Sequence, residues 1–179
     1  MLERKEVDAT LQKFGKYVIQ QSRSILTRTD SNASKRLYNS LKYEAKANPN
    51  SFELSFEMED YGKFQDLGVQ GASSSAKAPN SPYRFGSGTG RPGGLTEGIF
   101  SWITNYRRFQ FRDKQTGRFL SYEQTAFLIS RSIYQKGIKP KRFFTQPFER
   151  AFERLPDEVV EAYGLDVEGF LKFTVNDTN

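Results

Sequence analysis

Residues 41–58 read LKYEAKANPNSFELSFEM and carry the clearest structural pattern of the chain. On either side of Asn48-Pro49-Asn50, apolar and charged residues alternate with a period of two, which is typical of strands with one buried face. Asn-Pro-Asn is turn-forming, so the two strands are predicted to pair as an antiparallel hairpin. On the charged face of that hairpin lysine would lie opposite glutamate, which favours the pairing.

A long amphipathic helix is predicted before the hairpin, over residues 3–27. Its apolar residues recur at helical spacing and therefore share one face. They are Val7, Leu11, Phe14, Val18 and Ile25. The predicted fold class is α+β, with a small antiparallel sheet packed by this N-terminal helix and by C-terminal helices.

Shorter elements are predicted downstream of the hairpin. Ser121 and Gln124 have the spacing of a capping box, so a helix is expected to begin there. The predicted elements are a helical turn at 60–68, a helix at 95–106 with Thr96 as its cap, a second hairpin at 109–120, a helix at 121–135, an extended segment at 138–142, a helix from Phe144 that stops at Pro156, and a further helix that reaches Tyr163 and is followed by a short piece around Phe170.

Residues 68–94 differ in composition from the rest of the chain, because 15 of these 27 residues are Gly, Ser or Pro. A stretch of this length without periodicity is typical of a loop that is mobile or is ordered by a partner. We predict an extended loop at 68–94 within a single domain that covers 1–179, with an acidic C-terminal extension at 157–179.

The composition argues against catalysis. The 179 residues include no Cys and no His, which excludes thiol nucleophiles, disulfides, Cys/His zinc sites and histidine-based triads. The carboxylate pairs Glu57/Glu59 and Asp157/Glu158 are explained by exposed strand positions and by a helix start. No apolar run approaches the roughly 20 residues of a membrane helix, and no apolar leader follows Met1. We predict no enzyme activity.

Charge is distributed unevenly along the chain, whose net charge is +6. Residues 84–150 carry 13 basic and 4 acidic groups, whereas residues 153–179 carry 2 basic and 7 acidic groups. This asymmetry suits either a head-to-tail contact between identical chains or a contact with a polyanion.

Basic and aromatic residues are interleaved in Tyr106-Arg107-Arg108-Phe109-Gln110-Phe111-Arg112. In proteins that bind single-stranded nucleic acid, aromatic rings stack on bases and arginines contact phosphates. The simpler interpretation, which we favour, is a strand whose Phe109 and Phe111 pack inward and whose arginines are solvated. A basic nucleic-acid-binding protein is kept as the alternative function.

The tract Arg142-Phe143-Phe144-Thr145-Gln146-Pro147-Phe148 combines a core stripe with a candidate interface. Phe144 and Phe148 share a helical stripe and are expected in the core. Phe143 lies off that stripe and is expected to face outward beside Arg142, as interface anchors do. No catalytic, cofactor-binding or metal-ligating residue is predicted. The candidate protein-interface residues are Tyr83, Phe85, Arg107, Arg108, Lys139, Lys141, Arg142 and Phe143.

The order of these parts resembles the family of small tail-completion, neck and minor head–tail joining proteins of tailed double-stranded DNA bacteriophages. Residues 61–68, YGKFQDLG, are similar to the family's aromatic turn that ends in an acid, one residue and Gly. Residues 136–148, KGIKPKRFFTQPF, are similar to its Gly-x-x-Pro-x-Pro-Phe-x-x-Pro strand-to-helix signature, with Arg142 where many members carry Pro. Residues 122–133 resemble the insertion helix of larger members.

The resemblance implies an α+β fold, a ring of identical subunits around the DNA channel and no catalysis. It implies portal or adaptor and tail proteins as partners, with non-specific proximity to packaged DNA. The expected location is the neck or tail of the virion, after assembly in the host cytoplasm. No cofactor and no membrane partner are expected.

Overall fold

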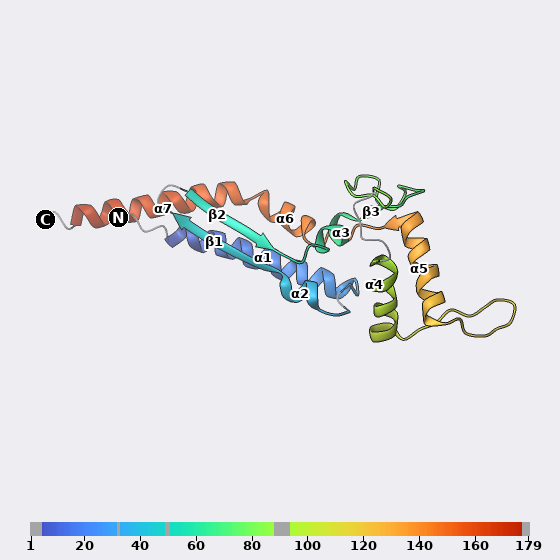
Figure 1. Cartoon of the computed structure of the whole chain (residues 1–179). Helices are drawn as coiled ribbons and strands as arrows, with labels where there is room; N and C mark the ends of the chain where they lie inside the picture. Colours follow the sequence, from blue (N-terminus) through green and yellow to red (C-terminus); the bar gives the residue numbers. More distant parts are fainter. Residues whose placement is uncertain (1–4, 32, 49–50, 88–93, 177–179) are drawn as a thin grey trace. The chain divides into compact units, whose positions relative to one another are not determined.

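The chain folds into two compact units (Figure 1). The computed structural model describes residues 5–31, 33–48, 51–87 and 94–176. The first unit combines Met1–Glu59 with Phe143–Asn179, and the second unit is Asp60–Arg142. The sequence predicted one domain, whereas the structure places the second unit as an insertion between the two halves of the first.

The first unit contains the predicted hairpin and the helices that cover it. The hairpin packs against α1, and α1 also packs against the two C-terminal helices. The α+β class and the long N-terminal helix are thereby confirmed. The elements are α1 (Lys5–Arg28), α2 (Arg36–Ser40), β1 (Lys42–Asn48), β2 (Ser51–Glu57), α6 (Thr145–Phe152) and α7 (Leu155–Asn176).

The register of the hairpin agrees with the alternation in the sequence. Lys42 lies opposite Glu57, and Lys46 lies opposite Glu53, as predicted. Gly15 lets the hairpin approach α1 closely, because a Cβ atom at this position would lie 2.2 Å from Cδ2 of Tyr43. The turn residues Pro49 and Asn50 lie outside the described residues.

An aromatic cluster joins the hairpin to α1 and α6. The ring centroid of Phe56 lies 6.3 Å from that of Phe14, 5.3 Å from that of Phe144 and 5.9 Å from that of Phe148, in edge-to-face geometry. Such pairs stabilise a core beyond the area they bury. Phe144 and Phe148 therefore occupy the core, as predicted. The buried members of this core are Val7, Leu11, Phe14, Val18, Leu155 and Ala162.

A side chain of α7 caps the start of α1. The carboxylate of Asp166 accepts hydrogen bonds from the backbone N–H groups of Glu6 (3.0 Å) and Val7 (3.1 Å), and so satisfies two donors at the start of α1. The prediction that Pro156 stops a helix was wrong. Pro156 lies in the first turn of α7, where its missing N–H costs no intrahelical bond. The acidic extension is one helix rather than two pieces.

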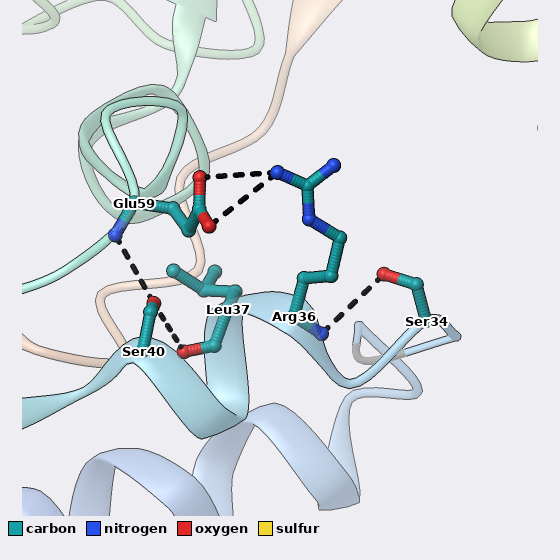
Figure 2. A network of polar contacts seen from close by, with 5 residues as sticks. All are labelled: Ser34, Arg36, Leu37, Ser40 and Glu59. Carbon is teal, nitrogen blue, oxygen red and sulfur yellow. Dashed lines mark hydrogen bonds and ion pairs between the residues drawn. The ribbon is translucent and has the colours of Figure 1, made fainter.

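Polar contacts fasten α2 to the segment that leaves the hairpin (Figure 2). Nη2 of Arg36 lies 3.4 Å from Oε1 of Glu59, and the backbone N–H of Glu59 donates to Oγ of Ser40 at 3.1 Å. Ser40 Oγ in turn donates to the carbonyl of Leu37 at 3.0 Å. The guanidinium of Arg23 in α1 donates to the carbonyl oxygen atoms of Tyr38 in α2 and of Leu41, which follows α2.

The second unit is built around the helix pair α4 and α5. The capping box is confirmed, because Ser121 Oγ accepts from the N–H of Gln124 and the Gln124 side chain accepts from the N–H of Ser121. Thr96 is not a cap, since α4 already begins at Gly94. The elements are α3 (Gly62–Leu67), β3 (Val69–Gln70), α4 (Gly94–Trp102), the π-helical turn η1 (Ile103–Arg107), α5 (Tyr122–Lys136) and β4 (Gly137–Ile138).

Residues 68–87 follow a hydrogen-bonded path, although their composition has no periodic pattern. The strand β3 pairs with β4, and the N–H of Ala72 donates to the carbonyl of Tyr134 at 2.8 Å. Glycine is required at two positions where this loop contacts the end of α5. A Cβ atom would lie 2.1 Å from the Gln135 carbonyl oxygen at Gly71, and 2.3 Å from that of Val69 at Gly137, whose φ is +80°. The rest of the predicted loop, residues 88–93, lies outside the described residues.

Candidate functional site

The predicted interface residues do not form one surface. Lys139, Lys141 and Arg142 follow β4 and are exposed. The N–H groups of Lys141 and Arg142 donate to the carbonyls of Gln65 (2.9 Å) and Asp66 (3.0 Å), so this extended segment lies along α3. Arg142 adopts a left-handed backbone conformation with φ +48°.

Tyr83 and Phe85 pack inside the second unit. The ring of Tyr83 meets Phe64 of α3 edge to face at 4.7 Å, and the ring of Phe85 lies 5.7 Å from that of Tyr134 on α5. Both side chains are half-buried. They anchor the loop at 68–87 on two helices and leave only part of their surface for a partner.

The expectation that Phe143 faces outward was wrong. Phe143 is 0% exposed and is among the largest fully buried side chains of the described residues. The helix α6 begins at Thr145, and the left-handed turn at Arg142 precedes the buried ring. Sequence spacing separated Phe143 from the stripe of Phe144 and Phe148, but its ring is buried without belonging to that stripe.

A basic arm, defined as residues 108–120, leaves the end of η1 and returns to α5 (Figure 1). It is the second hairpin that the sequence predicted. Within the arm Arg112 and Phe119 form the bridge pair, the N–H of Asp113 donates to the carbonyl of Arg118, and the N–H of Leu120 donates to that of Phe111. The described part of the arm is therefore a hairpin that is narrow and largely solvated.

The base of the arm is anchored by three contacts. The N–H of Phe111 donates to Oγ1 of the buried Thr125 at 3.2 Å, and Gln110 Nε2 donates to the carbonyl of Leu120 at 2.8 Å. Phe109 packs edge to face on Trp102 at 5.9 Å. Phe109 thus packs inward as predicted, but Phe111 is 40% exposed and does not.

The tip of the arm is organised by Asp113. Its Oδ1 accepts hydrogen bonds from the N–H groups of Gln115 (2.9 Å) and Thr116 (2.7 Å) and from Oγ1 of Thr116 (3.0 Å). These bonds, led by that from the Thr116 backbone, favour the charged carboxylate and hold the pKa of Asp113 below its usual value. The one acid of the arm is therefore engaged in the turn.

The outward charges of the arm are consequently all positive. Arg108, Arg112, Lys114 and Arg118 are exposed, and Cζ of Arg112 lies 4.5 Å from the ring centroid of Phe119. Phe119 is 60% exposed. Cations beside exposed rings can contact an acidic partner that also offers apolar surface. The sequence predicted this hairpin and named Arg108 among the interface candidates, but it did not single out Lys114, Arg118 or Phe119.

The two units carry opposite net charge. The second unit has 14 basic and 5 acidic side chains, and the first unit has 13 basic and 16 acidic side chains. The net charges are thus +9 and −3. The basic arm concentrates part of this excess at one end of the second unit.

Comparison of the chain with protein-family models, with curated proteins and with solved structures finds no match. Across residues 5–31, 33–48, 51–87 and 94–176, no group of three or more acidic side chains is placed to hold a metal ion. None of the helices in the described ranges is long and apolar enough to cross a membrane.

Proposed function

We propose that this chain is a non-catalytic structural subunit that assembles head to tail into a ring in a bacteriophage neck, where it joins the portal or its adaptor to the tail. The observation that carries the proposal is the opposite net charge of the two units, +9 and −3. A heterologous contact brings different surfaces of identical chains together and closes into a ring when the rotation permits. Opposite charges on those surfaces favour that contact and disfavour like-to-like pairing.

The neck location is supported by two local structures. The helical turn α3 is followed by Gly68, whose φ of +73° suits the glycine that closes the family's aromatic turn. The strand β4 leads through Pro140 to α6, in which Pro147 occupies the first turn. Both segments correspond to the motifs on which the resemblance to the neck family rests.

A basic nucleic-acid-binding protein is the alternative that the same charge favours. The second unit has a net charge of +9, and its arm combines exposed arginines with exposed rings. Phosphate contacts release counterions, so binding of this kind weakens steeply with added salt. Neither catalysis nor a cofactor is part of either function.

The test is to image the purified full-length chain by negative-stain electron microscopy, with sedimentation velocity at low and high salt. Closed rings, or oligomers that dissociate as salt rises, are expected. A chain that stays monomeric at every concentration and salt, and that retards DNA in a gel with a steep salt dependence, would instead support the alternative. A monomer that also fails to bind DNA would exclude both functions.

A further inference from the structure

The outer face of α7 is acidic with apolar margins. Residues spaced three or four apart share one side of a helix. The residues on the outer side of α7 are all exposed. The apolar Val160 (72% exposed) and Leu165 (51% exposed) lie at the two edges of this side. The opposite side holds Ala162 and Asp166, which are buried. We define the acidic face as Asp157, Val160, Glu161, Gly164, Leu165 and Glu168.

We propose that the basic arm of one copy docks on the acidic face of α7 in a second copy. The inference rests on the proposed ring and names the two surfaces that form its subunit contact. Arg112, Lys114 and Arg118 would meet Asp157 and Glu161. The exposed rings of the arm would cover the apolar margins of the helix.

The two surfaces agree in size. From Asp157 to Glu168 the helix rises about 16 Å, at 1.5 Å per residue. From Phe109 to Asp113 one strand of the arm extends about 13 Å, at 3.3 Å per residue. Gly164 lies in the middle of the acidic face, and a Cβ atom there would meet nothing within 4 Å. A small side chain introduced at this position would therefore not disturb α7 itself.

The chemistry favours a second copy over nucleic acid. Exposed ion pairs contribute little by themselves, so a stable contact also needs apolar burial. Phe111 and Phe119 of the arm, and Val160 and Leu165 of α7, can supply that burial on both sides. The charges then set the orientation and exclude arm-to-arm and helix-to-helix contacts.

The absence of cysteine from the chain permits a direct test by cross-linking. One full-length variant carries Thr116→Cys at the tip of the arm, and another carries Gly164→Cys on the acidic face. Both positions are exposed. Mixing the two under mild oxidation is expected to yield a disulfide-linked heterodimer. The matched control replaces Gly164→Cys by Gln20→Cys, an exposed position on α1, and is expected to cross-link to Thr116→Cys at background rate.

Charge reversal sharpens the test. Arg112→Glu with Arg118→Glu in the arm copy should lower the cross-linking rate about tenfold at low salt, because attraction becomes repulsion. Asp157→Lys with Glu161→Lys in the partner copy should restore it. Arg131→Glu, a reversal on α5 outside the arm, should change little. Circular dichroism confirms that every variant is folded.

The outcomes separate this inference from the proposed ring. Rings without a cross-link between Thr116→Cys and Gly164→Cys would overturn the arm contact and leave the ring standing. No rings and no cross-link would overturn both. A cross-link that ignores charge reversal would show that the arm does not recognise α7 by charge. If charge reversal in the arm abolishes DNA retardation in a gel but leaves cross-linking unchanged, the arm binds nucleic acid and not α7.

Discussion

Each of the two units is stabilised internally in a different way. Among the described residues, eleven apolar side chains are buried in the first unit and four in the second. Exposed large apolar side chains show the reverse, with six in the first unit and nine in the second. The four buried in the second unit are Val69, Ala78, Ile103 and Ala126.

In the second unit, backbone hydrogen bonds and close approach at glycines take the place of a large core of buried side chains. The first unit is stabilised by the aromatic cluster and by the cap from Asp166 on α1. The second unit is held by hydrogen bonds between the loop at 68–87 and the end of α5, and by close approach at its glycines. A unit that leaves more large apolar side chains exposed than it buries is typical of one that completes its packing on a partner.

The largest effect is expected from the aromatic core of the first unit. Phe14→Ala removes a ring that is 5% exposed and that contacts Phe56 and Phe148, so the free energy of unfolding should fall by about 3–5 kcal/mol. Urea unfolding followed by circular dichroism measures this change. Hydrogen exchange should locate the loss of protection in α1 and the hairpin. Equal loss in α5 would show that the two units unfold as one body and would break the comparison.

Tyr17→Ala on the same helix is the matched control. Tyr17 is 42% exposed, so its truncation should cost about 1 kcal/mol or less. If both variants lose the same stability, the buried cluster is not what holds the first unit.

A smaller effect is expected from the backbone closure of the second unit. In Gly71→Ala the new Cβ would lie 2.1 Å from the carbonyl oxygen of Gln135, and overpacking of this kind costs about 1–3 kcal/mol. Hydrogen exchange at residues 69–85 should accelerate while the first unit keeps its protection. Gly98→Ala in α4 meets open space and should be neutral or stabilising by up to about 1 kcal/mol. Destabilisation by both variants would mean that close approach is not the cause.

The smallest effect is a local dependence of the arm on pH. The hydrogen bonds from Thr116 and Gln115 lower the pKa of Asp113, so the turn is favoured by the charged carboxylate. That contribution is fully present above the ordinary aspartate value of about 4 and is lost as the pH falls through the lowered pKa. Amide exchange or limited proteolysis at the tip of the arm, measured from pH 7 down to pH 2, should show this loosening.

Asp113→Ala is expected to loosen the tip at every pH and to remove its acid dependence, without changing the unfolding of the first unit. A tip that loosens with the same pH profile in this variant would mean that another group controls the turn.

Much of the first unit could be predicted from the sequence because its signals are local and periodic. The alternation around Asn48-Pro49-Asn50 indicated the hairpin and its lysine–glutamate register. The helical spacing of Val7, Leu11 and Phe14 indicated α1. The capping box at Ser121 in the second unit also needs only neighbouring residues, so it too was predicted.

The candidate site was harder to predict, because it depends on which residues a distant segment covers. Spacing alone suggested that Phe143 faces outward, but a left-handed turn at Arg142 precedes it and the ring is buried. Spacing likewise suggested that Phe111 packs inward, whereas the arm leaves it 40% exposed. The interface candidates therefore included Phe143 and the basic residues beside it, and from the arm they included only Arg108.

Residues that are close along the chain were enough to establish the α+β class, the hairpin register, the ends of several helices and the uneven charge. Contacts between distant segments were needed to reveal that residues 60–142 form a unit of their own and that the loop at 68–87 is hydrogen-bonded to the end of α5. It also placed Asp166 at the start of α1, about 160 residues away. The physical reason is that hydrogen bonds and steric approach between distant segments leave no periodic pattern in either segment.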